Sequence, residues 1–263
     1  MSKAILVTSL KGGVGKTTVS AGIACGLSMT GARVLAVDMD FVSGGLDVAL
    51  GCENLVAVPI TDYLSGDAPC EDIANPTSFH GLFFAASPML RRSFFELDGD
   101  GGAAKVRRIL CEIKTGFDYT VFDMPAGGGE LFDALASSPL FDMILVVATD
   151  SVNSIRSAEK TAYELAALSR RPVKLVINGY DLVSHKNNTS GIVELISRTG
   201  IPVIGVVPYT QFAEKALSEG KPLTAVKNNP AGIALANISK RIAGLRVPLL
   251  DGIVKKRRRK SFY

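Results

Sequence analysis

The sequence predicts an α/β fold in which a mostly parallel, twisted sheet carries helices on both faces. Two observations predict this fold: short strand-like runs alternate with stretches of helical periodicity, and most of the runs are apolar throughout, as in strands covered on both sides. The chain has 263 residues, of which 47% are hydrophobic and 21% charged, and it contains neither a repeat nor a long linker. We therefore expect a single globular domain.

The expected elements follow one another in alternating order. Strands are predicted at residues 4–8, 34–38, 82–86, 119–123, 143–148, 173–178 and 203–207. Helices are predicted at residues 16–29, 103–115, 131–137, 154–168, 191–198 and 231–243. Residues 88–102 show no period and are expected to form a surface loop.

The first predicted strand runs into a glycine-rich loop, Leu10-Lys11-Gly12-Gly13-Val14-Gly15-Lys16-Thr17-Thr18, and a helix follows at once. This order suits phosphate binding, because glycines let backbone N–H groups turn toward an anion and the helix start adds its positive end. Lys16 is expected to reach the β- and γ-phosphates, and the Thr17 hydroxyl to ligate Mg²⁺. The usual pattern has glycine at the position of Leu10. This chain lacks that glycine and has a second lysine, Lys11, at the next position.

Several aspartates lie at or just beyond the ends of predicted strands: Asp38, Asp40, Asp123 and Asp150. The carboxyl ends of parallel strands meet at one edge of the sheet, and this edge is where open α/β sheets bind ligands. The acids are therefore expected to lie near the phosphate loop.

In these motifs the chain resembles the MinD/ParA family of deviant Walker A ATPases, P-loop NTPases whose loop reads K-G-G-x-G-K-[ST]-[ST]. Within that family it is more similar to the MinD branch than to the partitioning branch. The resemblance extends to about residue 244 and includes residues 37–40, 46–51, 122–127, 205–208 and 219–222.

The resemblance implies an ATP hydrolase that forms a homodimer when it binds Mg²⁺-ATP. Lys11 would cross the dimer interface to the partner's phosphates, and Asp40 would orient the attacking water. Thr17 would ligate Mg²⁺, with Asp38 and Asp123 supporting the ion through water. The nucleotide would contact Lys11, Gly12, Gly13, Val14, Gly15, Lys16, Thr17, Thr18, Asn178 and Pro208, the last two in the adenine pocket.

The sequence favours ATP over GTP. A GTPase normally supplies N-K-x-D, whose aspartate reads the guanine base. Here Asn178-Gly179-Tyr180-Asp181 keeps the spacing but lacks the lysine.

Other proteins with related loops are disfavoured, but two relatives remain open. Iron–sulfur carriers bridge their cluster through paired cysteines, whereas residues 126–131 contain no cysteine and the chain has no C-x-x-C. A tyrosine kinase would carry a tyrosine-rich tail, and this tail has only Tyr263. A ParA-like ATPase that partitions DNA and a MinD-like regulator of flagellar number both stay as alternatives.

The net charge of +4 is concentrated at the C-terminus. Six consecutive cations occur there, and the rest of the chain carries a net −2; the cations are Lys255, Lys256, Arg257, Arg258, Arg259 and Lys260. We therefore divide the chain into an ATPase domain, residues 1–246, and a basic tail, residues 247–263. Apolar and basic residues stand in separate blocks of the tail, which departs from the amphipathic helix of the family.

The six cations and Phe262 are expected to contact an anionic membrane surface, with DNA phosphate as the second choice. Neither a signal sequence nor a spanning segment is present, so we expect a cytoplasmic protein that is peripheral on the inner face of the cell membrane. By resemblance it would position the division site with a regulator of the MinC or MinE kind. The helix corresponding to the regulator-binding region has Ser157 after Arg156, where the family has an acid.

Overall fold

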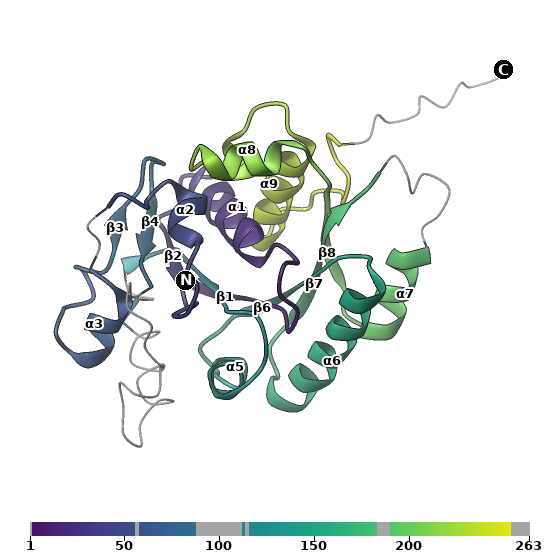
Figure 1. Cartoon of the computed structure of the whole chain (residues 1–263), viewed down its shortest axis with the longest axis horizontal. Coiled ribbons are helices and arrows are strands. Elements are labelled where there is room, and N and C mark those ends of the chain that lie inside the picture. The colour runs from purple at the N-terminus through teal and green to yellow at the C-terminus, as the bar shows by residue number, and fades with distance from the viewer. Residues whose placement is uncertain (1, 56–57, 88–111, 114–115, 183–189, 254–263) are drawn as a thin grey trace.

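The computed structural model describes residues 2–55, 58–87, 112–113, 116–182 and 190–253 (Figure 1). Its strands are β1 Lys3–Thr8, β2 Val34–Asp38, β3 Asn75–Pro76, β4 Leu82–Ala85, β5 Tyr119–Asp123, β6 Met143–Ala148, β7 Val173–Tyr180 and β8 Val203–Pro208. Its helices are α1 Lys16–Ser28, α2 Leu46–Leu50, α3 Ile60–Ser65, α5 Glu130–Ala136, α6 Val152–Leu168, α7 Ser190–Thr199, α8 Phe212–Ser218 and α9 Pro230–Ile242, with a short 3-10 helix, η1, at Leu223–Ala225.

The described strands form one sheet in the order β3-β4-β2-β5-β1-β6-β7-β8. The short edge strand β3 pairs antiparallel with β4, and the other neighbours pair in parallel. β1 lies in the interior of the sheet between β5 and β6, so the loop that follows β1 opens at the carboxyl edge between two strand ends. The predicted fold class is confirmed.

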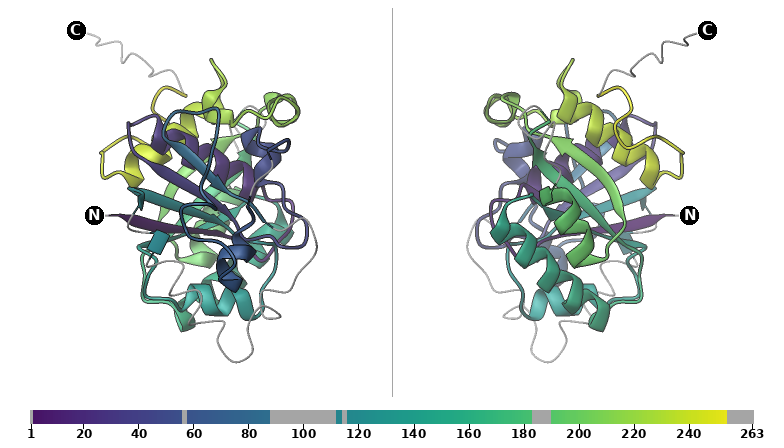
Figure 2. Two further views of the ribbon diagram at one scale, coloured as in Figure 1. Left: turned by 90° about the vertical axis from the view of Figure 1, so that its left-hand side faces the viewer. Right: turned by 90° about the vertical axis from the view of Figure 1, so that its right-hand side faces the viewer.

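Helices cover both faces of the sheet (Figures 1 and 2). One face carries α1, α2, α8 and α9, whose buried side chains share a core with alternate residues of the central strands, for example Val19 and Leu235 with Val121. The opposite face carries α3, α5, α6 and α7, and its core includes Phe122 and Phe141, whose rings meet edge to face at 5.2 Å. All five residues of β2 are buried, as a strand covered on both sides requires.

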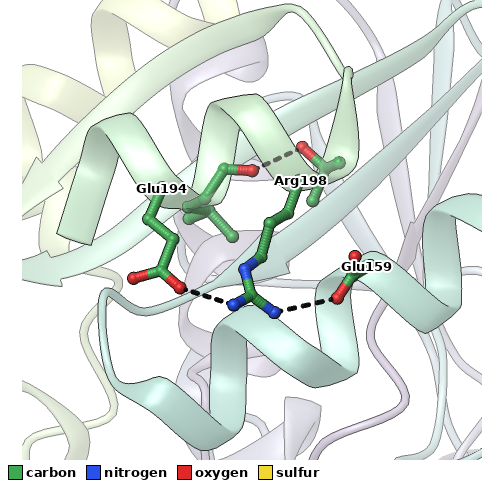
Figure 3. A network of polar contacts seen from close by, with 5 residues as sticks. Glu159, Glu194 and Arg198 are labelled. Atoms are coloured by element: carbon green, nitrogen blue, oxygen red, sulfur yellow. Dashed lines mark hydrogen bonds and ion pairs between the residues drawn. The ribbon is translucent and has the colours of Figure 1, made fainter. Parts of the chain in front are cut away.

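Exposed charges join α6 to α7. The Arg198 guanidinium of α7 lies 2.9 Å from the carboxylate of Glu194 on its own helix and 3.3 Å from that of Glu159 on α6 (Figure 3). Leu195, which is fully buried in the same helix, packs into the core beneath. α7 is thus held to the body of the molecule by an apolar contact below and a charged contact above.

The chain continues past α9 as a packed segment, residues 245–253, which we call the C-terminal strap. Arg241 of α9 donates hydrogen bonds from its guanidinium to the carbonyl groups of Ile204 at 2.7 Å, Val247 at 2.8 Å and Pro248. Asn237 donates to the Asp251 carbonyl at 2.7 Å. Contacts therefore extend beyond residue 246, the boundary proposed from the sequence for the ATPase domain. Residues 249–253 form turns and not a helix.

Most predicted elements lie within two residues of the observed ones at each end, but three short α-helices and one short strand were missed. These are α2, α3, α8 and β3, each no more than seven residues long. Apart from residues 112–113, which are helical, the helix predicted at 103–115 falls outside the described residues, as does the loop predicted at 88–102. In the part of the chain that is described, none of the helices is both long and apolar enough to cross a membrane.

Candidate nucleotide site

The loop between β1 and α1 has the backbone of an anion-binding nest. Gly13 and Gly15 adopt left-handed φ angles of 74° and 87°, which other residues rarely adopt. A Cβ atom on Gly15 would also collide with the side-chain amide of Asn178, which donates a hydrogen bond to the Val14 carbonyl at 2.8 Å. No side chain among the described residues caps the start of α1, so its first N–H groups point toward the loop and suit a phosphate.

The two lysines of the loop lie in different surroundings. Lys16 is only 8% exposed, and its ammonium donates to the Lys11 carbonyl across the loop at 3.4 Å. The Lys11 ammonium instead lies at an exposed position, 3.3 Å from the hydroxyl of Ser151, which is 3.0 Å from that of Thr149. One cation thus faces the inside of the loop, and the other lies at its rim.

Asp38 and Asp123 meet at the carboxyl edge of the sheet because they are paired residues at the ends of neighbouring strands β2 and β5. Asp38 accepts the N–H groups of Asp40 at 2.9 Å and of Leu46 at 3.1 Å, one on each carboxylate oxygen. It thereby organises the turn that carries Asp40 and the start of α2. The Asp40 carboxylate in turn accepts the N–H of Ser43 at 2.9 Å.

Asp123 lies at the base of the phosphate loop. It accepts a hydrogen bond from the Ser20 hydroxyl at 2.7 Å and another from the Thr17 side chain. The two hydroxyls lie on successive turns of α1, so the helix that follows the phosphate loop is fastened to the strand that carries this acid.

Burial makes the charges of the site unfavourable when they stand alone. It raises the pKa of Asp38 to about 7, and the nearby charge of Asp123 raises it further. Burial also raises the pKa of Asp123 to about 6, although the hydrogen bonds from Thr17 and Ser20 lower it in part. Burial also lowers the pKa of Lys16, partly offset by the charges of Asp123 and Asp40. A divalent cation beside the acids and an anion beside the lysine would each favour the charged forms.

These residues fit a magnesium–nucleotide complex. The loop offers left-handed glycines, an uncapped helix start and a lysine directed inward, all of which suit the phosphates. Thr17, Asp38 and Asp123 supply hydroxyl and carboxylate oxygens, the ligand type that Mg²⁺ prefers, in numbers that leave room for phosphate oxygens and water.

Of the two residues predicted for the adenine pocket, Asn178 lies beside the loop, and Pro208 lies at the end of β8, which is separated from β1 by β6 and β7. Asn178, on β7, contacts the loop through its bond to Val14, and Pro208 ends β8 in register with Tyr180. The tail residues predicted to contact phosphate, residues 255–260 and Phe262, lie outside the described residues.

Comparison with known proteins identifies the family. Residues 5–223 match the model of the CobQ/CobB/MinD/ParA nucleotide binding domain. The chain belongs to this family. Membership in its MinD/ParA branch of ATPases implies ATP hydrolysis.

Individual relatives of the MinD/ParA family agree over almost the whole chain. The septum site-determining protein MinD of Bacillus subtilis is 32% identical over 95% of this chain and 92% of its own. The MinC:MinD cell division protein complex of Aquifex aeolicus matches with a TM-score of 0.82 and 27% identity, covering 94% of this chain and 98% of that one. MinD of Pyrococcus horikoshii, solved in complex with Mg-ADP, shares the fold with a TM-score of 0.77 at 23% identity, covering 92% of this chain and 96% of that one.

Three contacts of the site were not predicted from the MinD/ParA motifs. Ser20 lies outside the loop motif, Ser151 lies on the β6–α6 connection, and the Asn178 side chain contacts the loop in addition to its expected place near the base. The signal for Ser20 was its position, since it follows Lys16 by four residues and therefore lies one helical turn further along the same face of α1.

Proposed function

We propose that the protein is a switch driven by Mg²⁺-ATP: two copies pair around ATP, the pair binds an anionic membrane surface, and hydrolysis separates the copies again. Division-site placement is the cellular role that the MinD relatives favour. The observation that carries the proposal is the placement of two lysines in one phosphate loop, with Lys16 inside it and Lys11 at its rim.

The division of labour follows from this placement. Lys16 would neutralise charge on the β- and γ-phosphates of the nucleotide in its own loop, while Lys11 is free of the loop interior and could reach the phosphates held by a second copy. Asp40, held by the turn that Asp38 organises, would orient the attacking water. Thr17, Asp38 and Asp123 would hold Mg²⁺, which when bound neutralises charge on the phosphate oxygens.

Substitution of the two lysines separates pairing from binding. Lys11→Ala is expected to retain ATP affinity within about threefold but to lose ATP-induced dimers, measured by light scattering on a sizing column, because its cation acts on the other copy. Lys16→Ala is expected to lose most of the affinity itself, by about 100-fold. Dimers of Lys11→Ala that form with ATP as in the unsubstituted protein would contradict the role of Lys11.

The strap and the tail support membrane contact. The strap exposes Leu245 at 56% and Leu249 at 42%, and the run of six cations begins at Lys255, shortly after the strap ends. Each cation near an anionic leaflet contributes about 1 kcal/mol, so six give at most about 6 kcal/mol. Pairing would bring two tails to one surface and raise the affinity by about 100-fold or more, so that binding depends on the nucleotide.

Vesicles of anionic phosphatidylglycerol or neutral phosphatidylcholine test this contact. The full chain with ATP should sediment with anionic vesicles, and the chain truncated after Val254 should not. A chain of equal length with glutamine at residues 255–260 is the matched control for charge. Equal sedimentation of the full and truncated chains would refute membrane contact, and tight ATP-dependent binding to DNA instead would favour the partitioning ATPase.

A regulator protein is also proposed, because a MinD relative is solved with MinC. The exposed face of α6 is where we expect it to bind, and Tyr163 there is 72% exposed. Cells lacking the protein are expected to form misplaced septa. Normal septa with an altered number of flagella would favour the flagellar regulator.

A further inference from the structure

Two helices that start on different sides of the nucleotide site end against each other. α2 starts at Leu46, whose N–H is held by the Asp38 carboxylate, and α8 starts shortly after Pro208 on the side predicted for the base. The two helices pack together beside α1 (Figure 1). α2 ends at Gly51, and Gly220 follows α8 closely.

Gly51 and Gly220 touch so closely that neither position has room for a side chain. Both are left-handed, with φ angles of 68° and 59°. A Cβ atom on Gly51 would lie 2.6 Å from the carbonyl oxygen of Gly220, and one on Gly220 would lie 2.5 Å from the Cα atom of Gly51. Both obstacles are backbone atoms, which cannot rotate away as a flexible side chain can, so an added methyl group must push the two segments apart.

The backbone on both sides of this contact is fixed by hydrogen bonds. Cys52 donates to the Asp47 carbonyl at 2.8 Å across the end of α2, and Lys221 donates to the Ala216 carbonyl at 2.8 Å across the end of α8. Shortly after Gly220, the Thr224 hydroxyl donates to the Gly22 carbonyl of α1 at 2.7 Å. A displacement at the glycine pair would therefore move whole elements rather than be absorbed by one loose turn.

Both glycines lie in segments that the family resemblance includes, residues 46–51 and 219–222, yet neither segment supplies a residue of the nucleotide site. We propose that Gly51 and Gly220 form a joint that fixes the turn of Asp38 and Asp40 relative to α8, and that they are positioning residues for ATP hydrolysis. This inference rests on the proposed role of Asp40. It assigns to the two segments the task of keeping that carboxylate in place over the phosphate loop.

Gly220→Ala is the variant that opens the joint. Its methyl group is expected to displace α2 by about 1 Å, and a misplacement of that size can lower a rate by about 100-fold. We expect kcat for ATP to fall by about 10- to 100-fold. ADP affinity should stay within about threefold, because neither the phosphate loop nor Lys16, the first residue of α1, touches the glycine pair.

Gly200→Ala is the matched control. Gly200 has nearly the same left-handed φ, 63°, but an added Cβ there meets nothing within 4 Å. Both variants carry the same backbone strain, but only Gly220→Ala adds a clash with backbone atoms, so it should lose more thermal stability than Gly200→Ala, and only Gly220→Ala should lose kcat. Equal kcat values for the two variants, or a parallel loss of ADP affinity in Gly220→Ala, would overturn the inference.

A measurement on the unsubstituted protein decides the question if Gly220→Ala does not fold. Hydrogen exchange should slow in residues 46–52 and in residues 216–221 together when a non-hydrolysable ATP analogue and Mg²⁺ are added. Slowing confined to residues 46–52 would overturn the joint. The proposed function fails separately: Asp40→Asn with an unchanged rate removes the role of Asp40, whereas Gly220→Ala with an unchanged rate removes only the joint.

Discussion

Two cations that face backbone carbonyl groups distinguish two regions of this molecule. Arg241 donates to the carbonyl groups of Val247, at 2.8 Å, and Pro248 in the C-terminal strap, and to that of Ile204 in β8 at 2.7 Å. Lys16 donates to the Lys11 carbonyl at 3.4 Å, at the long end of the hydrogen-bond range. The guanidinium donates three hydrogen bonds that hold the chain, whereas the ammonium is held loosely inside a loop that suits an anion.

The difference shows how a structural cation can be told from a functional one. Burial lowers the pKa of both cations, but Arg241 is compensated by three donated hydrogen bonds and Lys16 by a single long one, so the Lys16 charge is the less well compensated. A residue kept at such a position is explained better by its ligand than by stability. Variants of the two regions should therefore have opposite effects: loss of activity at unchanged stability in the loop, and loss of stability at unchanged activity in the strap.

Lys16→Ala should produce the largest effect. The ATPase rate is expected to fall by at least about 100-fold, because the cation that faces the phosphates is lost. The free energy of unfolding in urea, measured without nucleotide, should stay within about 1 kcal/mol, because a poorly compensated buried charge is removed.

Lys240→Ala is the control for this prediction, because Lys240 is exposed on α9, far from the loop in sequence. Its rate should remain within twofold of the unsubstituted protein. A Lys16→Ala protein that hydrolyses ATP at the normal rate would refute the site, and one that loses several kcal/mol of stability would show that Lys16 is structural after all.

Arg241→Ala should show the opposite pattern at an intermediate size. Three hydrogen bonds from one guanidinium are lost, and the free energy of unfolding is expected to fall by about 2–4 kcal/mol, measured in urea. Arg241→Lys should not restore it, because one ammonium cannot reach the carbonyl groups of Ile204, Val247 and Pro248 together. The ATPase rate should change by less than about twofold.

Arg246→Ala is the control for Arg241→Ala. It shows whether stability depends on the Arg241 hydrogen bonds or is lost when any arginine near the strap is removed. Arg246 is exposed in the same segment, so its loss should change stability by no more than about 0.5 kcal/mol. Similar losses of stability in Arg241→Ala and Arg246→Ala would contradict the role of the Arg241 hydrogen bonds in holding the strap. A tenfold loss of activity in Arg241→Ala would remove the contrast between the two regions.

The same contrast explains what could be predicted from the sequence. The phosphate loop is local: nine consecutive residues specify its glycines, its lysines and its helix start. Asp38 and Asp123 are distant in sequence, but each ends an apolar strand, so strand position alone placed them at one edge. Ser20 was missed because its place one turn after Lys16 is only a weak signal, and its bond to Asp123 depends on β5 passing beside α1.

The strap and the short helices could not be predicted for related reasons. The strap is held by hydrogen bonds from Arg241 and Asn237 to backbone carbonyl groups. Every residue has such a group, so the sequence does not show which ones are bonded. α2 and α8 span only five and seven residues, so a hydrophobic period has little length in which to appear, although the seven-residue α5 was predicted. Their positions are set instead by the Asp38 contact at one end and the two glycines at the other.

Arg198→Ala should have the smallest effect on stability. It extends the comparison of Lys16 and Arg241 to a third cation, one that is exposed. The Arg198 side chain is 42% exposed, and its partners Glu159 and Glu194 are 32% and 46% exposed, so solvent screens both ion pairs. The free energy of unfolding is expected to fall by less than about 1 kcal/mol, and by still less in 1 M salt. Leu195→Ala in the same helix should cost about 2–5 kcal/mol, because it leaves a cavity in the core.

These two variants of α7 separate the stability that an exposed ion pair contributes from the stability that core packing contributes. Arg198 and Arg241 both bridge segments, but Arg241 directs its donors at backbone carbonyl groups, and its loss leaves the strap with fewer anchors. If Arg198→Ala were as damaging as Leu195→Ala at both low and high salt, charge alone would suffice to fasten a helix here. The distinction between Arg241 and Lys16 would then have to rest on activity and not on stability.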